Sequence, residues 1–272
     1  MALFEIVPNL SEGRDAAIVA AACAAVETTG AQVLDWSSDA VHHRSVLTIV
    51  GNAVQVVEAA VVLAGVAAER IDLRGHGGAH PRIGALDVLP FVPLRDATLA
   101  DAAALAHRAG AEIWKRYGVP SFYYGAAARR LERRLLPDIR RNAGWLPDEG
   151  DVVRHESAGA IAIGARDVLI AFNVELAGTD LAPARAIASA IRERGGGLRS
   201  LRALALPRAA DRVQVSFNVT DYAATPLYRI VELVRRLAAK HGVEVLGCEL
   251  IGCLPRAAVE SAAAYYLGVN TL

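Results

Sequence analysis

The sequence predicts an α+β fold of two βαββαβ-type subdomains, each with a mixed sheet and helices on one face. Apolar residues alternate with period two in short segments rich in Val, Ile and Phe. They recur with the helical period in longer segments rich in Ala and Leu, and glycine or proline separates many of the segments. The order strand, helix, strand, strand, helix, strand occurs in each half of the chain, which indicates two related units.

The first half begins with an apolar strand that leads to Ser11, a candidate N-cap for the first helix. That helix ends near Gly30, in the position after a helix that glycine favours. The predicted elements of this half are strands 3–9, 31–37, 44–51, 85–94 and 120–125 and helices 15–29, 52–72 and 98–118.

The second half repeats the order without detectable sequence identity to the first, so the repeat is one of pattern. Its predicted elements are strands 168–176, 198–207, 212–222 and 243–252 and helices 182–195, 226–242 and 255–267. We expect an N-terminal subdomain of residues 1–165 and a C-terminal subdomain of residues 166–272. The segment 129–166 between the two patterns is dense in arginine and then rich in Gly, Pro and charge, which predicts a linker with solvated arginines.

Composition excludes several classes of protein. The chain has 272 residues, a formal net charge of zero and 54% hydrophobic residues, so no overall basic field recruits nucleic acid or an anionic membrane. The most apolar segment contains Gln55 and Glu58 and predicts a buried amphipathic helix, not a membrane span. The opening residues lack the basic start of a signal peptide, and three cysteines without paired short spacing suit a reducing compartment. We therefore expect a cytoplasmic protein.

The stretch "RGHGGAHPRIGALDVLPFVP", residues 74–93, concentrates titratable groups in a loop. Its glycines permit a close approach to a ligand, and Pro81 stiffens the chain directly after His80. Imidazole is suited to proton transfer near neutral pH, so His80 is a candidate acid/base with Arg82 beside it. A histidine bonded only to the backbone is the simpler interpretation of such a loop.

Two other interpretations of the stretch are weaker. His76 and His80 could bind a metal together with residues brought close by folding, but glycines between them make a helical metal pair unfavourable. The candidate partners are His42, His43, Asp72 and Asp87. "GHGGAH" lacks the third glycine of a dinucleotide fingerprint, and a G-x-S-x-G elbow is absent from the sequence.

The chain resembles the formiminotransferases, also called glutamate formimidoyltransferases, over nearly its whole length. The motifs that carry the resemblance are "IVPNLSEGRD", "DAVHHRSVLTIVG", "HGGAHPRIGALDVLPFVP", "AGAIAIGARDVLIAFNVEL" and "VLGCELIGCLP". The resemblance implies two α/β subdomains with a ligand tunnel between them, and it favours the stand-alone transferase without a cyclodeaminase domain. It implies transfer of the formimino group from N-formimino-L-glutamate to N5 of tetrahydrofolate, and it makes a homodimer a reasonable expectation.

The resemblance also implies site residues. The family's catalytic histidine corresponds to His80, and no metal is expected. Its folate-binding segment corresponds to Gly150, Asp151, Val152, Val153, Arg154, His155, Glu156, Ser157, Ala158 and Gly159. Because a guanidinium can bind a carboxylate with two hydrogen bonds, we expect Arg44 and Arg82 to contact substrate, and we add His43 as a substrate-binding residue.

This chain departs from the family pattern at several positions. Ser37, Ala79 and Ala126 stand where relatives often carry acidic residues, His43 stands where Asn is usual, and Ala158 replaces a bulkier residue of some members. A short stretch seen in relatives after Arg141 is missing. These changes leave open a folate-binding protein without this activity, or a different one-carbon donor such as 5-formyltetrahydrofolate. A metal-dependent hydrolase is a further alternative.

Overall fold

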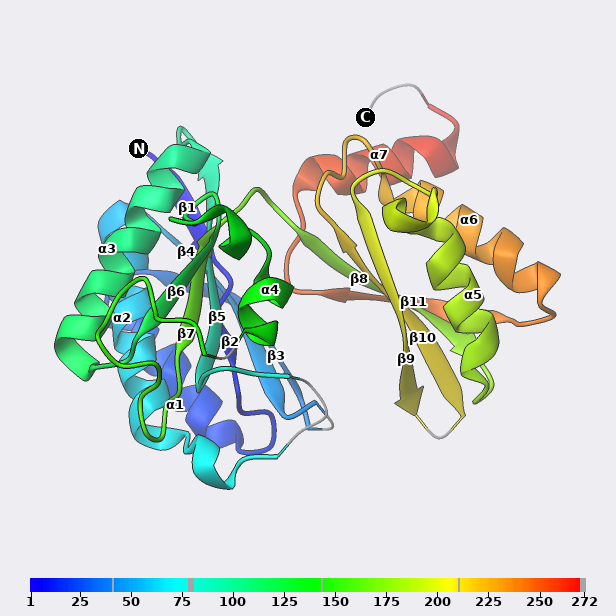
Figure 1. The fold of residues 1–272 in the computed structure, drawn as a ribbon. Coiled ribbons are helices and arrows are strands. Elements are labelled where there is room, and N and C mark those ends of the chain that lie inside the picture. Colours follow the sequence, from blue (N-terminus) through cyan, green and yellow to red (C-terminus); the bar gives the residue numbers. More distant parts are fainter. Residues whose placement is uncertain (41, 78–80, 143, 210, 270–272) are drawn as a thin grey trace. The chain divides into compact units, whose positions relative to one another are not determined.

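The computed structural model describes the whole chain except residues 41, 78–80, 143, 210 and 270–272 (Figure 1). The described residues separate into two compact units, Met1–Asp167 and Val168–Leu272. Each unit has its own sheet and its own hydrophobic core.

In the described residues, unit 1 contains a seven-stranded sheet with the order β1-β4-β2-β5-β7-β6, and β3 pairs with β4. The pairs on the β3, β4 side are antiparallel, whereas β5–β7 and β6–β7 are parallel, so this sheet is mixed as the sequence predicted. Its strands are β1 (Leu3–Ile6), β2 (Asn9–Leu10), β3 (Gln32–Asp39), β4 (Arg44–Gly51), β5 (Leu86–Arg95), β6 (Ser121–Gly125) and β7 (Ile161–Ala165).

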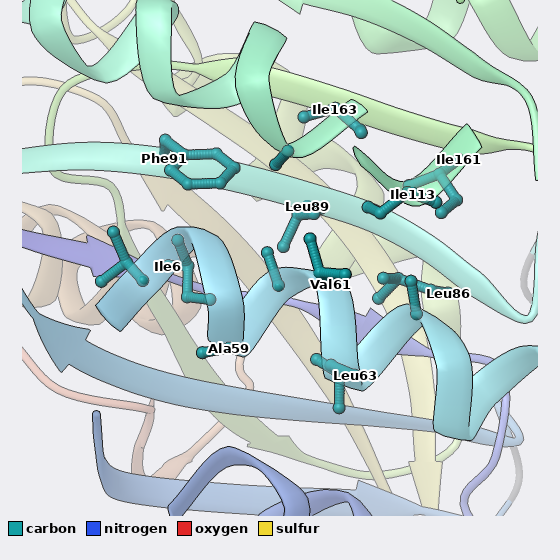
Figure 2. Packing of buried hydrophobic residues seen from close by; sticks show 14 of the residues in the cluster. Ile6, Ala59, Val61, Leu63, Leu86, Leu89, Phe91, Ile113, Ile161 and Ile163 are labelled. Carbon is teal, nitrogen blue, oxygen red and sulfur yellow. The ribbon is translucent and has the colours of Figure 1, made fainter. Parts of the chain in front are cut away.

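Three long helices cover one face of this sheet: α1 (Ala16–Glu27), α2 (Ala53–Arg70) and α3 (Leu99–Tyr117) (Figure 1). Figure 2 shows Val61 of α2 beside Leu89 of β5, in the same cluster as Phe91 of β5 and Ile163 of β7, whereas Leu63 lies on the other side of α2. All five side chains have essentially no exposed surface. Burying such aliphatic and aromatic side chains is the main favourable contribution to the stability of this layer.

The N-caps fix where these helices begin. Asn52 and Gln55 form a capping box at α2, and Thr98 and Asp101 form one at α3. The predicted cap of α1 is wrong, because Asp15 accepts the hydrogen bond from the Ala17 N–H whereas Ser11 Oγ donates to the Gly84 carbonyl oxygen, 2.7 Å away. Ser11 therefore joins β2 to the loop before β5.

The segment predicted as a linker packs onto unit 1. It contains the 3₁₀ turn η2 (Leu131–Arg133) and the short helix α4 (Leu136–Arg141). Another 3₁₀ turn of unit 1, η1 (Leu73–Gly75), follows α2. Ile139 of α4 packs on the sheet face opposite to the long helices, so helices occupy both faces of this sheet and not one as predicted (Figure 1). The solvated arginine face is also wrong for Arg133, which is 1% exposed and pairs with Asp148 at 2.8 Å.

Unit 2 has the predicted order of elements but not the predicted kind of sheet. Its described strands form the order β11-β8-β10-β9, and every pair is antiparallel. The prediction of a mixed sheet is wrong here because β10 lies between β8 and β9 and both of its neighbours run opposite to it. The elements are β8 (Ile170–Ala177), α5 (Leu181–Ile191), the 3₁₀ turn η3 (Glu193–Gly195), β9 (Leu201–Ala209), β10 (Arg212–Val219), α6 (Leu227–Lys240), β11 (Val245–Ile251) and α7 (Arg256–Leu267).

The two faces of the unit 2 sheet differ in polarity. Val174, Leu176 and Val215 belong to the core with α5 and α6. The other face carries a chain of ion pairs in which Arg208 contacts both Glu175 and Glu249, at 3.3 and 2.8 Å. Across the described part of the protein, no helix combines the length and the apolar composition needed to cross a membrane.

Candidate functional site

The loop that begins with Arg74 contributes its two ends to a polar cluster in unit 1. His76 follows η1, and Arg82 precedes β5. The predicted catalytic residue His80 lies outside the described residues, as does Ala79, so its position does not enter the geometry below. The described residues on either side of positions 78–80, His76 and Arg82, belong to the polar cluster.

His43 and His76 form a close, tilted ring pair in this cluster. Their ring centroids are 4.0 Å apart, with 32° between the ring planes. His43 is buried and adopts a left-handed backbone with φ of 51°. Burial lowers the pKa of His43, and the charges of Arg14 and Arg82 lower it further against the attraction of Glu12. Burial, the neighbouring ring and Arg82 lower the pKa of His76 as well.

A hydrogen bond indicates which nitrogen of the His43 ring carries the proton. The Gly13 N–H donates to Nδ1 of His43 at 3.1 Å, and Nη1 of Arg82 lies 2.9 Å from Nδ1 of His76. Since a backbone N–H can only donate, Nδ1 of His43 acts as an acceptor, and the neutral ring of His43 carries its proton on Nε2. Nη1 of Arg82 also lies 3.3 Å from Nε2 of His76, so these distances do not select the tautomer of His76. The lowered pKa of each ring favours its uncharged form.

Glu12 holds the turn that supports His43. Its Oε1 accepts hydrogen bonds from the backbone N–H groups of Gly13, Arg14 and Asp15 at 2.9, 2.7 and 2.9 Å. Burial opposes ionisation, but these donors and His43 together lower the pKa of Glu12. A Cβ at Gly13 would lie 2.3 Å from the Asp39 carbonyl oxygen, so only glycine fits this turn.

Arg82 ties the cluster to the loop between β3 and β4. Its Nη1 donates to the carbonyl oxygen of His43 at 3.1 Å, and its Nη2 donates to that of His42 at 2.9 Å. Burial lowers the pKa of Arg82, while Asp87 favours its charged form. The guanidinium is thus oriented by backbone oxygens on one side and by His76 on the other.

A second group of charges surrounds Asp87, which is 2% exposed. Its Oδ1 accepts from the Ile83 N–H at 2.7 Å, and its Oδ2 lies 2.6 Å from Nη2 of Arg140 and 3.5 Å from Nη2 of Arg44. Nε of Arg44 donates to Oδ1 of Asn9 at 2.8 Å. Burial lowers the pKa of Arg44 to about 10, with Asp87 opposing and Arg140 and Arg82 adding to the shift.

A small depression in this cluster, with no room for a water molecule between its described walls, is lined by Ser11, His43, Arg44, Arg82 and Asp87. The structure therefore brings together all three predicted substrate-binding residues, although His43 and Arg82 are far apart in the sequence. Two guanidinium groups beside neutral imidazoles can bind a carboxylate and exchange protons near neutral pH. Glu12 and Arg140 were not predicted as site residues, and His76 and Asp87 were predicted only as candidate metal ligands; the signal for Asp87 was its place as one carboxylate in an apolar strand.

The predicted folate-binding segment, Gly150–Gly159, lies beside this loop. The Leu73 N–H donates to the Ser157 carbonyl oxygen, and the Ala85 N–H donates to that of Ala158, each at 2.9 Å. His155 and Gly159 pair through both backbone hydrogen bonds, and Gly159 has φ of 71°. A Cβ at Gly159 would lie 2.2 Å from the Ile83 carbonyl oxygen, so this approach of two backbones requires glycine.

The two parts of this segment differ in exposure. Residues 151–154 are exposed, and Val152 and Val153 leave 43% and 36% of their surface in contact with solvent. Ala158 is buried. His155 borders a separate hollow of about 480 Å³ whose other lining residues are Ala25, Val62, Gly65, Val66, Ala68, Glu69 and Tyr117. The segment therefore combines an anchored hairpin with an exposed apolar loop.

The alternative metal site gains no support from the described residues, among which no group of three or more His, Cys, Asp or Glu side chains could hold a metal ion. His42 instead pairs with Asp39, whose Oδ2 lies 2.9 Å from Nδ1 of the ring. Asp72 binds Arg74, and this hydrogen bonding lowers the pKa of Asp72 to about 2.

Comparison with known proteins matches both units to one family. Residues 3–166 match the formiminotransferase domain, N-terminal subdomain, and residues 171–272 match the formiminotransferase domain. The chain is 41% identical to a glutamate formimidoyltransferase of Thermoplasma acidophilum and 38% identical to one of Streptococcus pyogenes; each alignment covers at least 98% of this chain and 94% of the relative. It is 37% identical to the formimidoyltransferase-cyclodeaminase of Gallus gallus, of which it covers 52%.

Proposed function

Because the chain belongs to the formiminotransferase family, we propose that it transfers the formimino group from N-formimino-L-glutamate to N5 of tetrahydrofolate. The products are 5-formiminotetrahydrofolate and L-glutamate, and the reaction is a step in histidine degradation. The observation that carries this proposal is the similarity to two glutamate formimidoyltransferases along nearly the whole length of this chain and of theirs.

The reaction needs a group that moves one proton between two nitrogens. When N5 of the pterin attacks the formimino carbon, N5 loses a proton, and the departing nitrogen of glutamate gains one. An imidazole can accept the first proton and donate the second. His80 is our candidate for this acid/base, because it is the histidine of the family motif and lies in the chain between His76 and Arg82. No metal ion enters this scheme.

The substrates would be held by the residues around the loop. Arg44 and Arg82, with His43, would bind carboxylate and orient the small donor; their shared depression supports this assignment. Gly150–Gly159 would bind tetrahydrofolate. The exposed valines of this segment suit the flat pterin and benzoyl groups, and Arg154 suits the glutamate tail of the folate.

The arrangement of subdomains belongs to the same proposal. We assign residues 1–165 and 166–272 to the two subdomains that bound a ligand tunnel, and we propose a homodimer as the working form. The match of one family model to each unit supports the two-subdomain assignment.

A different one-carbon donor is the second candidate. Ser37 is half-buried on β3 and Ala126 follows β6, at two positions where relatives often carry acidic residues. A missing carboxylate near a bound amidinium removes an attractive charge, which would favour a donor whose transferred group is uncharged, such as the formyl group of 5-formyltetrahydrofolate.

The assay that tests the function combines purified protein, tetrahydrofolate and N-formimino-L-glutamate, and follows formation of the 5-formimino product. We expect turnover in the wild type and its loss in His80→Ala that remains folded. If wild type turns over only 5-formyltetrahydrofolate, the second candidate replaces the first. Tight folate binding by calorimetry without any turnover would leave a folate-binding protein.

A further inference from the structure

Arg133 of η2 has no role in the function as stated so far, yet its guanidinium is buried and fully engaged. Its Nη1 lies 2.8 Å from Oδ2 of Asp148, and its Nη2 donates to the carbonyl oxygen of Leu146 at 2.7 Å. Its Cζ lies 5.2 Å from the centre of the Trp145 ring. One guanidinium therefore contacts three residues of segment 145–148.

The ion pair of Arg133 with Asp148 is a weak source of stability. Both side chains are only 2% exposed. Moving a guanidinium and a carboxylate out of water costs free energy that their mutual attraction offsets only in part. A buried pair of this kind is better explained by the single arrangement of the chain that it selects.

That arrangement fastens segment 146–149 alongside β6. The N–H groups of Asp148 and Glu149 donate to the carbonyl oxygen of Ser121 at 2.9 and 3.1 Å, and the Ser121 N–H donates to that of Glu149 at 3.0 Å. Oδ2 of Asp148 also accepts from the Tyr123 N–H at 2.9 Å. The carboxylate oxygen that pairs with the buried guanidinium is thus bonded to the β6 backbone as well.

Segment 146–149 leads directly into Gly150–Gly159, the segment that we assign to folate. The N–H groups of Leu73 and Ala85 donate to carbonyl oxygens near its far end, each at 2.9 Å. Residues 151–154 between these two anchors are exposed, and they form no hydrogen bond or ion pair with the rest of the described chain. The placement of residues 151–154 therefore depends on the anchors at both ends.

We propose that Arg133 is a positioning residue for tetrahydrofolate. Its guanidinium locks segment 146–149 on β6 and so holds residues 151–154 in the arrangement that binds the folate. The inference rests on the proposed function, which assigns Gly150–Gly159 to folate binding.

Arginine suits this role because of its planar fork. The fork reaches Asp148 and the carbonyl oxygen of Leu146 at once, whereas lysine ends in a single ammonium group. In the described part of the chain, the contacts of Arg133 include neither Arg44 nor Arg82, the proposed donor-binding arginines. A change at Arg133 should therefore affect the folate and leave the amino acid donor unaffected.

Steady-state kinetics of Arg133→Lys tests the proposal, because this variant keeps the charge opposite Asp148 and loses the fork. We expect the KM for tetrahydrofolate to rise about tenfold, while the KM for N-formimino-L-glutamate and kcat at saturation change less than about twofold. The matched control is Arg134→Lys, at the next position, where the side chain is exposed. This control should leave both KM values and kcat within about twofold of wild type.

Calorimetry with tetrahydrofolate alone gives a second readout, and Arg133→Lys should bind about tenfold more weakly. Unchanged affinity in folded Arg133→Lys would overturn the proposal. An equal rise of both KM values would also overturn it, because that result indicates a general structural defect. If Arg133→Lys does not fold, Asp148→Asn, which keeps an acceptor for the Tyr123 N–H and weakens the pair, should raise the Kd of tetrahydrofolate about threefold; no rise would contradict the proposal.

A variant of the exposed loop separates the failure of this inference from the failure of the proposed function. Val152→Ser with Val153→Ser changes two exposed side chains and leaves both anchors in place. If this double variant binds tetrahydrofolate as tightly as wild type, or if wild type does not bind it, the folate assignment fails and the role of Arg133 fails with it. If the double variant binds more weakly but Arg133→Lys binds as wild type does, only the positioning role is wrong.

Discussion

The paired histidines of the cluster, His43 and His76, make the folding stability depend on pH. His43 and His76 both have a pKa below the ordinary value, so the unfolded chain binds more protons than the folded chain as the pH falls through about 6.5. Folding stability contributed by the neutral rings is present above this pH and is lost progressively below it. Because the ring centroids are 4.0 Å apart, protonating one ring further disfavours protonating the other.

His43→Asn tests this dependence with little change to the backbone, because Asn tolerates the left-handed conformation observed at this residue. We expect thermal unfolding of wild type to shift to lower temperature between pH 8 and pH 5.5, and the variant to shift by a smaller amount. The two proteins should differ most at pH 8, where the neutral ring of His43 contributes fully, and less at pH 5.5. Parallel pH profiles for the two proteins would show that His43 does not titrate in this range.

The carboxylate of Glu12 is a second residue with a large expected effect. Its Oε1 accepts three backbone N–H groups in a buried turn, so Glu12→Ala leaves these donors without their partner. We expect a loss of about 1–3 kcal/mol in the free energy of unfolding, and a smaller loss for Glu12→Gln, which keeps an acceptor oxygen. Urea denaturation measures both. Glu27→Ala, at the exposed end of α1, is the control, and an equally small effect of Glu12→Ala would contradict the interpretation.

At the scale of elements, two helical glycines show how packing decides the effect of the same substitution. A Cβ at Gly110 of α3 would lie 2.2 Å from the hydroxyl of Tyr123, whose ring has no exposed surface. A Cβ at Gly65 of α2 would lie 2.5 Å from Cζ of Tyr117, which borders the 480 Å³ hollow and can move into it. The ring of Tyr123 is enclosed, whereas the ring of Tyr117 is not.

Gly110→Ala and Gly65→Ala therefore form a matched pair. Alanine in a helix interior is favoured over glycine by about 1 kcal/mol in both variants. Overpacking against Tyr123 costs about 1–3 kcal/mol, so we expect Gly110→Ala to destabilise the protein and Gly65→Ala to be close to neutral. Denaturant unfolding midpoints decide the order; equal destabilisation would mean that the Tyr117 ring cannot move.

The helices of the chain could be predicted from sequence because their signals are local. Apolar periodicity identified α2 and α3 to within a few residues. The cap of α1 was missed because Ser11 and Asp15 are both good caps, and the distant Gly84 decides between them by accepting the Ser11 hydroxyl. The antiparallel sheet of unit 2 was missed for a similar reason, since strand order depends on pairing between segments far apart in the chain.

For the whole molecule, the site shows the same limit of prediction from sequence, because local patterns do not reveal partners that lie far apart in the chain. Arg44 and Arg82 were predicted from side-chain chemistry and the family resemblance, and they do line one depression. Arg140 gave no such signal, because its partner Asp87 is 53 positions away and the charge pattern of its segment favoured solvated arginines. The loop motif therefore predicts the location of the polar cluster. The charged residues that surround Asp87 are identified only by the tertiary structure.

The two units should fold separately, because each has a sheet whose helix-facing side is already buried in its own core. We expect the fragment Val168–Leu272 to give dispersed amide resonances and a cooperative thermal transition, since its opposite sheet face carries the ion pairs of Arg208 with Glu175 and Glu249, which water solvates readily. Val215→Asp, placed in the unit 2 core, is the control and should abolish the transition. A wild-type fragment that stays unfolded under the same conditions would mean that unit 2 requires unit 1 to fold.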